Sequence, residues 1–441
     1  MTKIDDTRTN QIVKDFQERM DYDELLNCMR CGFCLPSCPT YMETGGNEAA
    51  SPRGRIALMK AVVDGKMKPD EDFEKQLSLC LGCRACEPAC PSGVKYGSLL
   101  EEALSILQKE KKHSVPVKMF RSLLFDQIFP KQTNMRKFSS LLWFYQRSGI
   151  QKIARTTKLT RIAGKQLSAM ERVLPTIPSP SQMKNRPTYI PVEGTVKKKV
   201  AFFSGCMMDT LFMETNDSTL FLLEKAGCEV YIPKAQNCCG ALHAHSGEKE
   251  KAKEMAKANI KAFEEAQVDY IISNAGGCGA LLVEYDHLLH GDSEWSKRAE
   301  AFVEKVKDIS EVLLEVGLPP MELSTQIVTY QDSCHLRNVM KTAFAPRALL
   351  KSIKGVTYIE MKEADRCCGS AGTYNILEQE MSMQILDHKM TQAKVTGATT
   401  IVTANPGCLL QMKLGIEREG LQESMRAIHM VDLLAEALKN K

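Results

Sequence analysis

The chain has 441 residues, of which 44% are hydrophobic and 25% are charged, and its formal net charge is +4. This composition is that of a globular protein and excludes a disordered or fibrous one. So small a net charge gives no reason to expect a nucleic-acid partner. The length exceeds what a single hydrophobic core usually supports, so we expect more than one domain.

The sequence contains 17 cysteines and opens with MTKIDDTRTNQIVKDF, which lacks the apolar core of a secretory signal. We therefore expect thiols that bind metal in a reducing compartment, and not disulfides. The longest aromatic-apolar run, SSLLWFY at 139–145, is far shorter than the roughly 20 residues that span a bilayer. These features predict a cytoplasmic protein that is soluble or peripheral on the inner face of the cytoplasmic membrane.

Two cysteine quartets with the same spacing lie in residues 1-110. The first is CMRCGFCLPSCP, which begins at Cys28, and the second is CLGCRACEPACP, which begins at Cys80. Four-thiolate zinc sites also use C-x2-C, but C-x2-C-x2-C-x3-C-P is the ferredoxin arrangement for two 4Fe-4S clusters, in which each fourth cysteine ligates the other cluster. We therefore predict a helical ferredoxin-type module with one cluster on Cys28, Cys31, Cys34 and Cys90 and a second on Cys80, Cys83, Cys86 and Cys38.

Residues 111-197 contain no cysteine and are rich in helix formers and Lys/Arg, and they include the proline-rich LPTIPSPSQ. They predict a helical connector followed by a linker. Between 120 and 165 basic residues are frequent, Asp126 is the sole acid, and Phe125, Phe129, Leu142, Trp143 and Phe144 are interleaved. A stretch with this pattern could rest on an anionic membrane surface. It could equally be a helical connector that packs on the core and has one solvated face, or a docking surface for a partner subunit.

After Lys197, short β-rich runs alternate with helical segments, which predicts parallel βαβ units. Four cysteine positions recur there at a nearly constant interval, so we predict two homologous α/β domains at 198-325 and 326-441, each with a Cys-Cys-Gly (CCG) motif. Ligands of open parallel sheets gather beyond the carboxyl ends of strands, so each quartet is a candidate site for a third or fourth cluster or for zinc. The first quartet is Cys206, Cys238, Cys239 and Cys278, and the second is Cys334, Cys367, Cys368 and Cys408.

The expected fold class is therefore multidomain, α+β and α/β: a helical two-cluster module, a helical connector and two repeated parallel-sheet CCG domains. Three histidines lie near the repeated cysteines, namely His243, His245 and His335, and each is a candidate ligand or, as is more usual, a supporting hydrogen-bond partner. Cys228 lies outside the repeat and is expected to be a core thiol.

The motifs CGFCLPSCPTY, SPRGRIALMK, CLGCRACEPACPSGVKYGSLLE and CCGSAGTYN, with the two CCG units, resemble the iron-sulfur subunit of glycolate oxidase from about Leu25 to the C-terminus. This resemblance implies FAD-containing partner subunits that oxidise glycolate to glyoxylate, with electrons passing through this chain to membrane quinone or another acceptor. The chain has no dinucleotide fingerprint and no phosphate loop. Since a flavin can take the two electrons of this oxidation, we expect FAD in the partner alone and no catalytic residue here.

The CCG units also resemble the cysteine-rich domains of heterodisulfide reductase and of anaerobic glycerol-3-phosphate dehydrogenase. In heterodisulfide reductase the last motif is C-x2-C, whereas Ala275 and Asn405 occupy its first position here. One thiol per unit is missing, and the four that remain suit an ordinary cluster or zinc. The alternatives are the equivalent subunit of a D-lactate or glycerol-3-phosphate dehydrogenase, a thiol-disulfide reductase, and a zinc-stapled scaffold.

Overall fold

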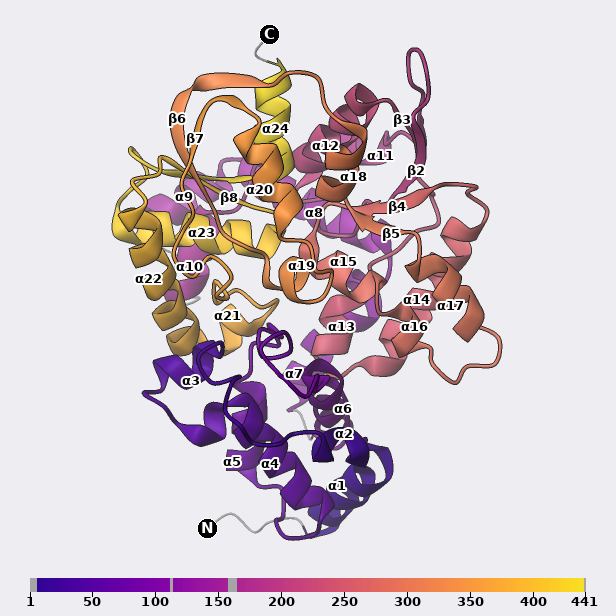
Figure 1. Cartoon of the computed structure of the whole chain (residues 1–441), viewed down its shortest axis with the longest axis vertical. Coiled ribbons are helices and arrows are strands. Elements are labelled where there is room, and N and C mark those ends of the chain that lie inside the picture. Colours follow the sequence, from indigo (N-terminus) through magenta and orange to yellow (C-terminus); the bar gives the residue numbers. More distant parts are fainter. Residues whose placement is uncertain (1–5, 112–113, 158–164, 440–441) are drawn as a thin grey trace.

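The computed structural model describes residues 6–111, 114–157 and 165–439. In Figure 1 the chain begins in a module of helices at one end of an elongated molecule and finishes at the opposite end, beside two sheets. The helices that join these parts run behind the sheets in this view. The predicted order of helical module, helical connector and two sheet-containing repeats is confirmed.

The N-terminal module is built from short helices around one apolar core. They are α1 (Asp6–Arg19), α2 (Tyr22–Leu26), α3 (Pro39–Glu43), the 3-10 helix η1 (Glu48–Ala50), α4 (Pro52–Val63), α5 (Glu71–Ser78) and α6 (Tyr96–Lys109). Ser51 caps α4 by accepting from Gly54 N, and Asp70 caps α5 by accepting from Phe73 N. These caps satisfy backbone donors that a helix start leaves free. In the core, the rings of Phe16 and Phe73 meet edge to face.

The connector is a series of helices fastened to the first repeat by ion pairs. It consists of α7 (Val115–Ser122), the π-helix η2 (Leu123–Ile128), α8 (Gln132–Arg147), α9 (Ile150–Thr156), α10 (Lys165–Arg172) and α11 (Pro180–Lys184). Arg121 pairs with Glu248 at 3.0 Å, and Arg136 pairs with Asp209 at 2.9 Å. Because the Asp209 carboxylate is buried, it needs such a partner. Part of the basic charge of the connector therefore serves packing.

Two parallel sheets form the centre of the repeats. Their strands are β1 (Tyr189–Ile190), β2 (Lys198–Phe202), β3 (Cys228–Tyr231), β4 (Tyr270–Ser273), β5 (Val306–Asp308), β6 (Glu322–Tyr330), β7 (Lys354–Tyr358), β8 (Thr400–Thr403) and β9 (Arg426–His429). The orders are β1-β3-β2-β4-β5, with β1 as an antiparallel edge strand, and β7-β6-β8-β9. The parallel part has the same order in both sheets, as expected of a duplication. The predicted βαβ units are thus confirmed.

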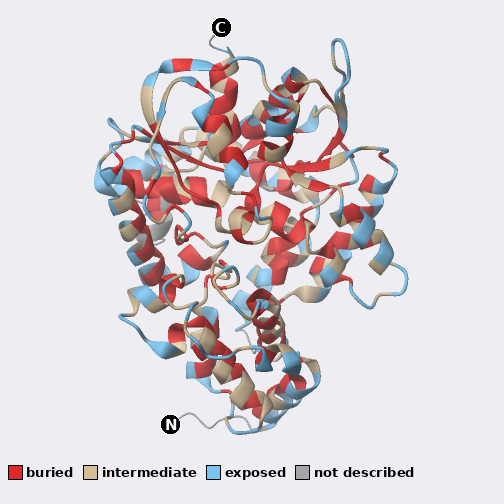
Figure 2. Ribbon diagram, viewed as in Figure 1, coloured by how far each residue is buried: buried red, intermediate tan, exposed pale blue. Residues whose placement is uncertain are grey.

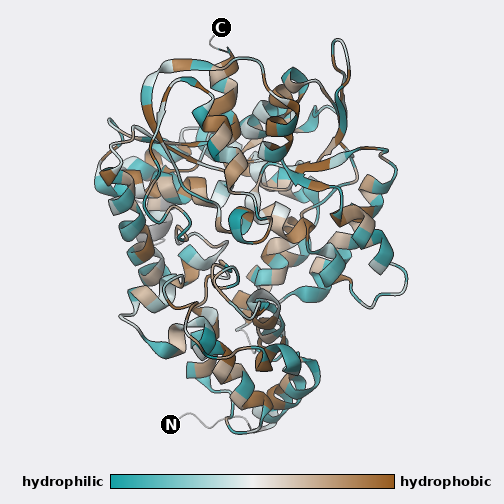
Figure 3. Cartoon of the chain, viewed as in Figure 1, coloured by the Kyte–Doolittle hydropathy of each residue, from teal (hydrophilic) through white to brown (hydrophobic). Residues whose placement is uncertain are grey.

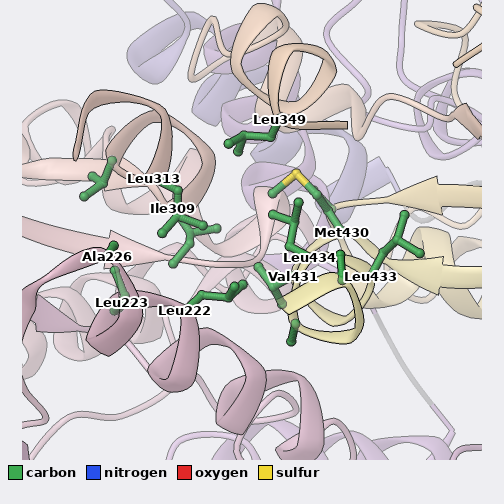
Figure 4. Close-up of a cluster of buried hydrophobic side chains, with 14 of the residues drawn as sticks. Leu222, Leu223, Ala226, Ile309, Leu313, Leu349, Met430, Val431, Leu433 and Leu434 are labelled. Carbon is green, nitrogen blue, oxygen red and sulfur yellow. The ribbon is translucent and has the colours of Figure 1, made fainter. Parts of the chain in front are cut away.

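Helices cover the sheets, and one hydrophobic core is shared by both repeats. The helices are α12 (Met213–Ala226), α13 (Ala241–His245), α14 (Lys249–Glu264), α15 (Gly276–Leu282), α16 (Tyr285–Leu288), α17 (Ser296–Val303), α18 (Ile309–Val316), α19 (Cys334–Asn338), α20 (Phe344–Lys351), α21 (Tyr374–Leu377), α22 (Gln379–Val395), α23 (Pro406–Glu419) and α24 (Met430–Lys439). Figure 4 shows Leu222 of α12 and Ile309 of α18, from the first repeat, beside Leu434 of α24 from the second. Buried residues follow the central strands β2, β4 and β8 (Figure 2), and these strands are hydrophobic (Figure 3). The repeats therefore fold against one another.

Asp308, between β5 and α18, makes stability depend on pH. Its side chain caps α18 by accepting from Ser310 N at 2.9 Å, and burial raises the pKa of Asp308 from 3.8 to about 7. As the pH rises from about 4 to about 7, the folded chain retains a proton that the unfolded chain releases, so stability falls. Asp308→Asn keeps a capping oxygen without this linkage. We expect its stability relative to the unaltered protein to increase by up to about 4 kcal/mol across this range. Thermal unfolding midpoints at several pH values test this, and a difference independent of pH would contradict it.

Candidate iron-sulfur sites

The cysteines predicted for the first cluster come from two segments and line one cavity. The residues around this cavity include Cys28, Cys31, Cys34 and Cys90, with Arg53, Pro52 and Tyr96. Burial raises the pKa of the Cys34 thiol, and the nearby Cys28 and Cys38 thiols raise it further. Cys31 is exposed. Cys86, which is predicted for the second cluster, also lines this cavity. Five thiols therefore surround it, and it lies at the surface of the module.

The cysteines predicted for the second cluster are near enough to affect one another's ionisation. Burial raises the pKa of Cys86, and so do the neighbouring Cys83, Cys80 and Cys38 thiols. Burial is also the main cause of the raised pKa of Cys83, to which Cys80 and Cys38 contribute. Gly82 N donates a hydrogen bond to Cys80 Sγ at 3.4 Å. Cys38, from the first quartet, thus lies with three cysteines of the second.

Arg55 places a buried positive charge beside these thiols. Its side chain is 0% exposed, Nε donates to Gln76 O at 2.6 Å, and Nη2 donates to Thr40 Oγ1 at 3.1 Å. Burial opposes its charge, but the nearby Cys80 and Cys38 favour it, and the net effect is a raised pKa of Arg55. Nη1 has no hydrogen-bond partner among the described residues. An unpaired N–H beside the Cys38 and Cys80 thiols suits a bound iron-sulfur cluster, whose sulfurs accept such bonds.

In each repeat, the four predicted cysteines form a continuous series of side-chain contacts. Cys206 Sγ lies 3.4 Å from Cys238 Sγ. Cys238 in turn contacts Cys239, which contacts Cys278. The neighbouring Cys206 and Cys239 thiols lower the pKa of Cys238, which favours a thiolate at this position. The second repeat has the same series in the order Cys334, Cys367, Cys368 and Cys408.

The donor set at the repeats suits either of two occupants. Gly240 N and Ala241 N donate to Cys238 Sγ and Cys239 Sγ, each at 3.5 Å. Hydrogen bonds to sulfur and an all-thiol donor set fit an iron-sulfur cluster, while four thiolates also fit zinc. Within the described ranges, no three Cys, His, Asp or Glu side chains are arranged to hold a single metal ion. In each repeat, successive cysteines contact one another without surrounding a single point. What indicates a metal or cluster site is therefore that all four side chains are thiols.

The second predicted cluster site lies directly against the second repeat. Cys83 packs in one buried group with Cys367 and Tyr374, and Cys334 lies at its edge. Asn338 Nδ2 donates to Cys83 O at 2.9 Å, across 255 residues of sequence. Burial and then Cys334 are the largest causes of the raised pKa of Cys83. The thiols of the module and those of the second repeat are thus neighbours.

The final cysteine loops of the two repeats touch each other. Gly276 N donates to Ala404 O at 3.0 Å, and Gly277 N donates to Asn405 Oδ1 at 3.0 Å. A Cβ atom on Gly276 would come within 2.4 Å of Ser333 Oγ, so a glycine permits this close approach. Asn405 Nδ2 also contacts Cys408 Sγ at 3.6 Å. Asn405 occupies the position where heterodisulfide reductase has a cysteine. Its side chain therefore links the final loop of the first repeat to the Cys408 thiol of the second repeat.

The three histidines near the quartets have other partners. His243 Nε2 lies 2.7 Å from Phe125 O, and His245 Nδ1 lies 3.0 Å from Glu101 Oε1. His335 Nε2 lies 2.9 Å from Gly82 O in the second-cluster loop. These contacts suit a supporting role, the more usual of the two predictions. For Cys228, the predicted core location is confirmed, because its thiol is fully buried at the start of β3.

Arg55 and Asn338 were not predicted as site residues. Arg55 lies within SPRGRIALMK, where a charged residue interrupts the apolar face of α4, and this interruption is a usable signal. Asn338 follows Cys334 by four residues, which places it one helical turn away, but nothing local indicates that it faces the other module.

Comparison with known proteins begins with family descriptions. A 4Fe-4S dicluster domain matches residues 24–94, and a cysteine-rich domain matches 200–282 and again 328–413. The linker region of the glycolate oxidase iron-sulfur subunit matches 116–174. The chain is 62% identical to the probable glycolate oxidase iron-sulfur subunit of Bacillus subtilis (strain 168), over 98% of each chain. It belongs to the glycolate oxidase iron-sulfur subunit family.

Other matches agree with this membership. The glycolate oxidase iron-sulfur subunit of Escherichia coli (strain K12) is 30% identical over 91% of this chain and 93% of its own. Lactate utilization protein A of Geobacillus kaustophilus is 34% identical over 54% of this chain and 98% of its own. A solved structure of a hypothetical protein from Helicobacter pylori shares the fold, with a TM-score of 0.50 and 9% identity over 90% of this chain and 69% of that one.

The family assignment confirms the predicted resemblance and the general chemistry. This subunit of a glycolate oxidase carries a 4Fe-4S dicluster domain and two cysteine-rich repeats, so it is an iron-sulfur component of an oxidoreductase complex. Membership in such a complex also implies a partner subunit. Across the described ranges, no helix has both the length and the apolar character needed to cross a membrane.

Proposed function

We propose that this subunit carries electrons from FAD-containing glycolate oxidase subunits, which oxidise glycolate to glyoxylate, to the membrane quinone pool. The observation that carries the proposal is the succession of thiol sets from an exposed end of the module to the interior of the second repeat. Bound iron-sulfur clusters would transfer electrons one at a time. This role suits a subunit that receives electrons from a flavin, which accepts two electrons from the substrate.

The exposed apolar side chains around Cys31 support the proposal that the flavoprotein binds at this end of the module. Leu26, Met29 and Phe33 are all exposed there, beside the cavity that contains the first thiol set. Contiguous exposed apolar side chains are typical of protein docking surfaces. We assign Cys28, Cys31, Cys34 and Cys90 to a 4Fe-4S cluster at this surface.

The packing of Cys83 against Cys334 and Cys367 supports a route of transfer between the module and the second repeat. A second 4Fe-4S cluster on Cys80, Cys83, Cys86 and Cys38 would lie between the first site and the second repeat. We propose a third cluster at the second repeat, on the quartet that begins with Cys334. The quartet of the first repeat, which begins with Cys206, would hold a fourth cluster or zinc.

Glycolate is favoured over lactate as the substrate of the complex, because the glycolate oxidase subunits align with more of this chain than the lactate utilization protein does. The glycolate oxidase subunits align over 98% and 91% of this chain, whereas the lactate utilization protein aligns over 54%. A thiol-disulfide reductase is less well supported, because Ala275 and Asn405 replace cysteines that the heterodisulfide reductase motif contains.

Substrate-dependent reduction tests the proposal. The subunit is purified anaerobically together with its flavoprotein subunits, and glycolate, D-lactate or glycerol 3-phosphate is added separately. We expect glycolate to produce the electron paramagnetic resonance signals of reduced iron-sulfur clusters faster than the other two substrates do. Preferential reduction by D-lactate or glycerol 3-phosphate would reassign the complex. Reduction of the flavin alone, with oxidised clusters, would contradict the role of this chain.

A further inference from the structure

The connector exposes an unusual amount of apolar surface. Nearly half of the large exposed apolar side chains of the described chain lie between residues 115 and 153, less than a tenth of its length. Leu141 of α8 is 69% exposed and Ile153 of α9 is 63% exposed. The full set is Val115, Val117, Met119, Phe120, Leu123, Phe138, Leu141, Phe144, Ile150 and Ile153. Monomeric proteins seldom expose so many neighbouring apolar side chains without a binding role.

This apolar set is accompanied by positive charge that has no internal partner. Exposed basic side chains on the same helices and the adjoining loop form no ion pair with any described residue, and they are Lys118, Lys131, Lys137, Arg147 and Lys152. The only acid between 115 and 155 is Asp126, which pairs with Lys251. We call these apolar and basic side chains together the connector face.

The inner side of the same helices fixes the orientation of this face. Met135 and Ser139 of α8 are buried, and Leu142 and Trp143 pack against the core of the second repeat. Phe125 of η2 is buried beside His243. Phe129 also packs inward, against Phe125 and His243. Of the five aromatic and apolar residues interleaved with the basic ones, only Phe144 belongs to the outward-facing set.

We propose that the connector face rests on an anionic lipid bilayer, with its apolar side chains in the interfacial region and its lysines among the headgroups. Four of the five unpaired basic residues are lysines, which are depleted at protein–protein interfaces but attracted to anionic headgroups. The face combines large apolar side chains with basic charge on helices too short and polar to span a bilayer, as interfacial helices do.

This inference rests on the proposed function, since transfer to a membrane acceptor requires contact with the membrane. The connector face also differs from the surface around Cys31, which we assign to the flavoprotein. The two binding events can therefore be tested separately.

Sedimentation of the purified full-length subunit with vesicles tests the inference. The vesicles contain either phosphatidylcholine alone or an equal mixture with phosphatidylglycerol, and no quinone. We expect binding to the mixed vesicles that weakens as salt rises. Because each cation near an anionic surface strengthens binding about fivefold, Lys137→Gln, Arg147→Gln and Lys152→Gln together should weaken it roughly a hundredfold. Leu141→Ser with Ile153→Ser should weaken binding to both vesicle types.

Matched variants control for charge and apolarity. Lys234→Gln, Lys297→Gln and Lys362→Gln remove three exposed lysines outside the connector, and Phe344→Ser with Leu377→Ser removes exposed apolar side chains there. All of these should bind vesicles as the unaltered subunit does. Equal loss in connector and control variants, or no vesicle binding at all, would overturn the proposal. So would a connector variant that binds vesicles normally but no longer associates with the flavoprotein subunits or with a second copy.

Iron and sulfide content, measured on the same samples, separates this inference from the proposed function. Variants of the connector face should retain the full content of both. A subunit that binds vesicles but contains no iron would refute electron transfer and leave the membrane contact standing.

Discussion

Cys38→Ala is expected to remove the cluster proposed for the second quartet and to leave the cluster at Cys28, Cys31, Cys34 and Cys90 in place. Cys38 is the last cysteine of the first quartet in sequence, yet its thiol is among those that raise the pKa of Cys83 and Cys86. Loss of one of four thiolate ligands should lower the iron content by up to about four atoms per chain. Iron and sulfide analysis, with electron paramagnetic resonance of the reduced protein, measures this.

Two further variants make the test specific. Cys90→Ala should have the opposite effect, with loss of the first cluster and retention of the second. Cys228→Ala removes a buried thiol outside every quartet and should leave iron and sulfide unchanged. If Cys38→Ala instead removed the same signal as Cys31→Ala, each quartet would hold its own cluster, and the exchange of fourth ligands would be wrong.

Arg55→Leu is expected to destabilise the module and to lower the reduction potential of the second cluster. The substitution leaves Gln76 O and Thr40 Oγ1 without the donors they now have, and it removes the cation beside Cys38 and Cys80. Breaking a buried charged network of this kind costs about 3–5 kcal/mol. A reduced cluster carries one more negative charge, so loss of a nearby cation disfavours reduction.

Thermal unfolding and a redox titration followed by electron paramagnetic resonance measure these effects. Arg8→Leu is the matched control, because Arg8 pairs with Glu74 at 2.6 Å on the outside of the same module. Such a partly exposed pair contributes about 0–1 kcal/mol, so the control should shift stability slightly and the potential very little. A potential unchanged in Arg55→Leu would show that Arg55 serves packing alone.

The sequence predicted the dicluster domain and the repeats well, because both depend on spacing within short segments. The gaps between cysteines and the recurrence of the CCG motif are visible without knowledge of distant contacts, as is the alternation of strand and helix. In both sheets the second parallel strand of the repeat lies at one edge of the parallel part, followed by the first, third and fourth (β3-β2-β4-β5 and β7-β6-β8-β9), and this common order follows from the same duplication.

Contacts between distant segments could not be predicted in this way. The hydrogen bond from Asn338 to Cys83 O joins parts of the chain 255 residues apart and is one of the contacts that hold the second repeat against the module. In the connector, the pattern indicated an amphipathic stretch but not which side chains face inward. Trp143 packs inward while Phe144 is exposed, although they are adjacent in sequence.

Metal and sulfide analysis of the anaerobically purified subunit tests the central claim most directly. The claim is that thiol sets from Cys28 to Cys408 hold a series of iron-sulfur clusters that extends from the module into the second repeat. The account predicts at least about 12 iron and as many acid-labile sulfide per chain, for two clusters in the module and one in the second repeat. About 8 of each, with zinc in the repeats, would end the series at the module and contradict the account.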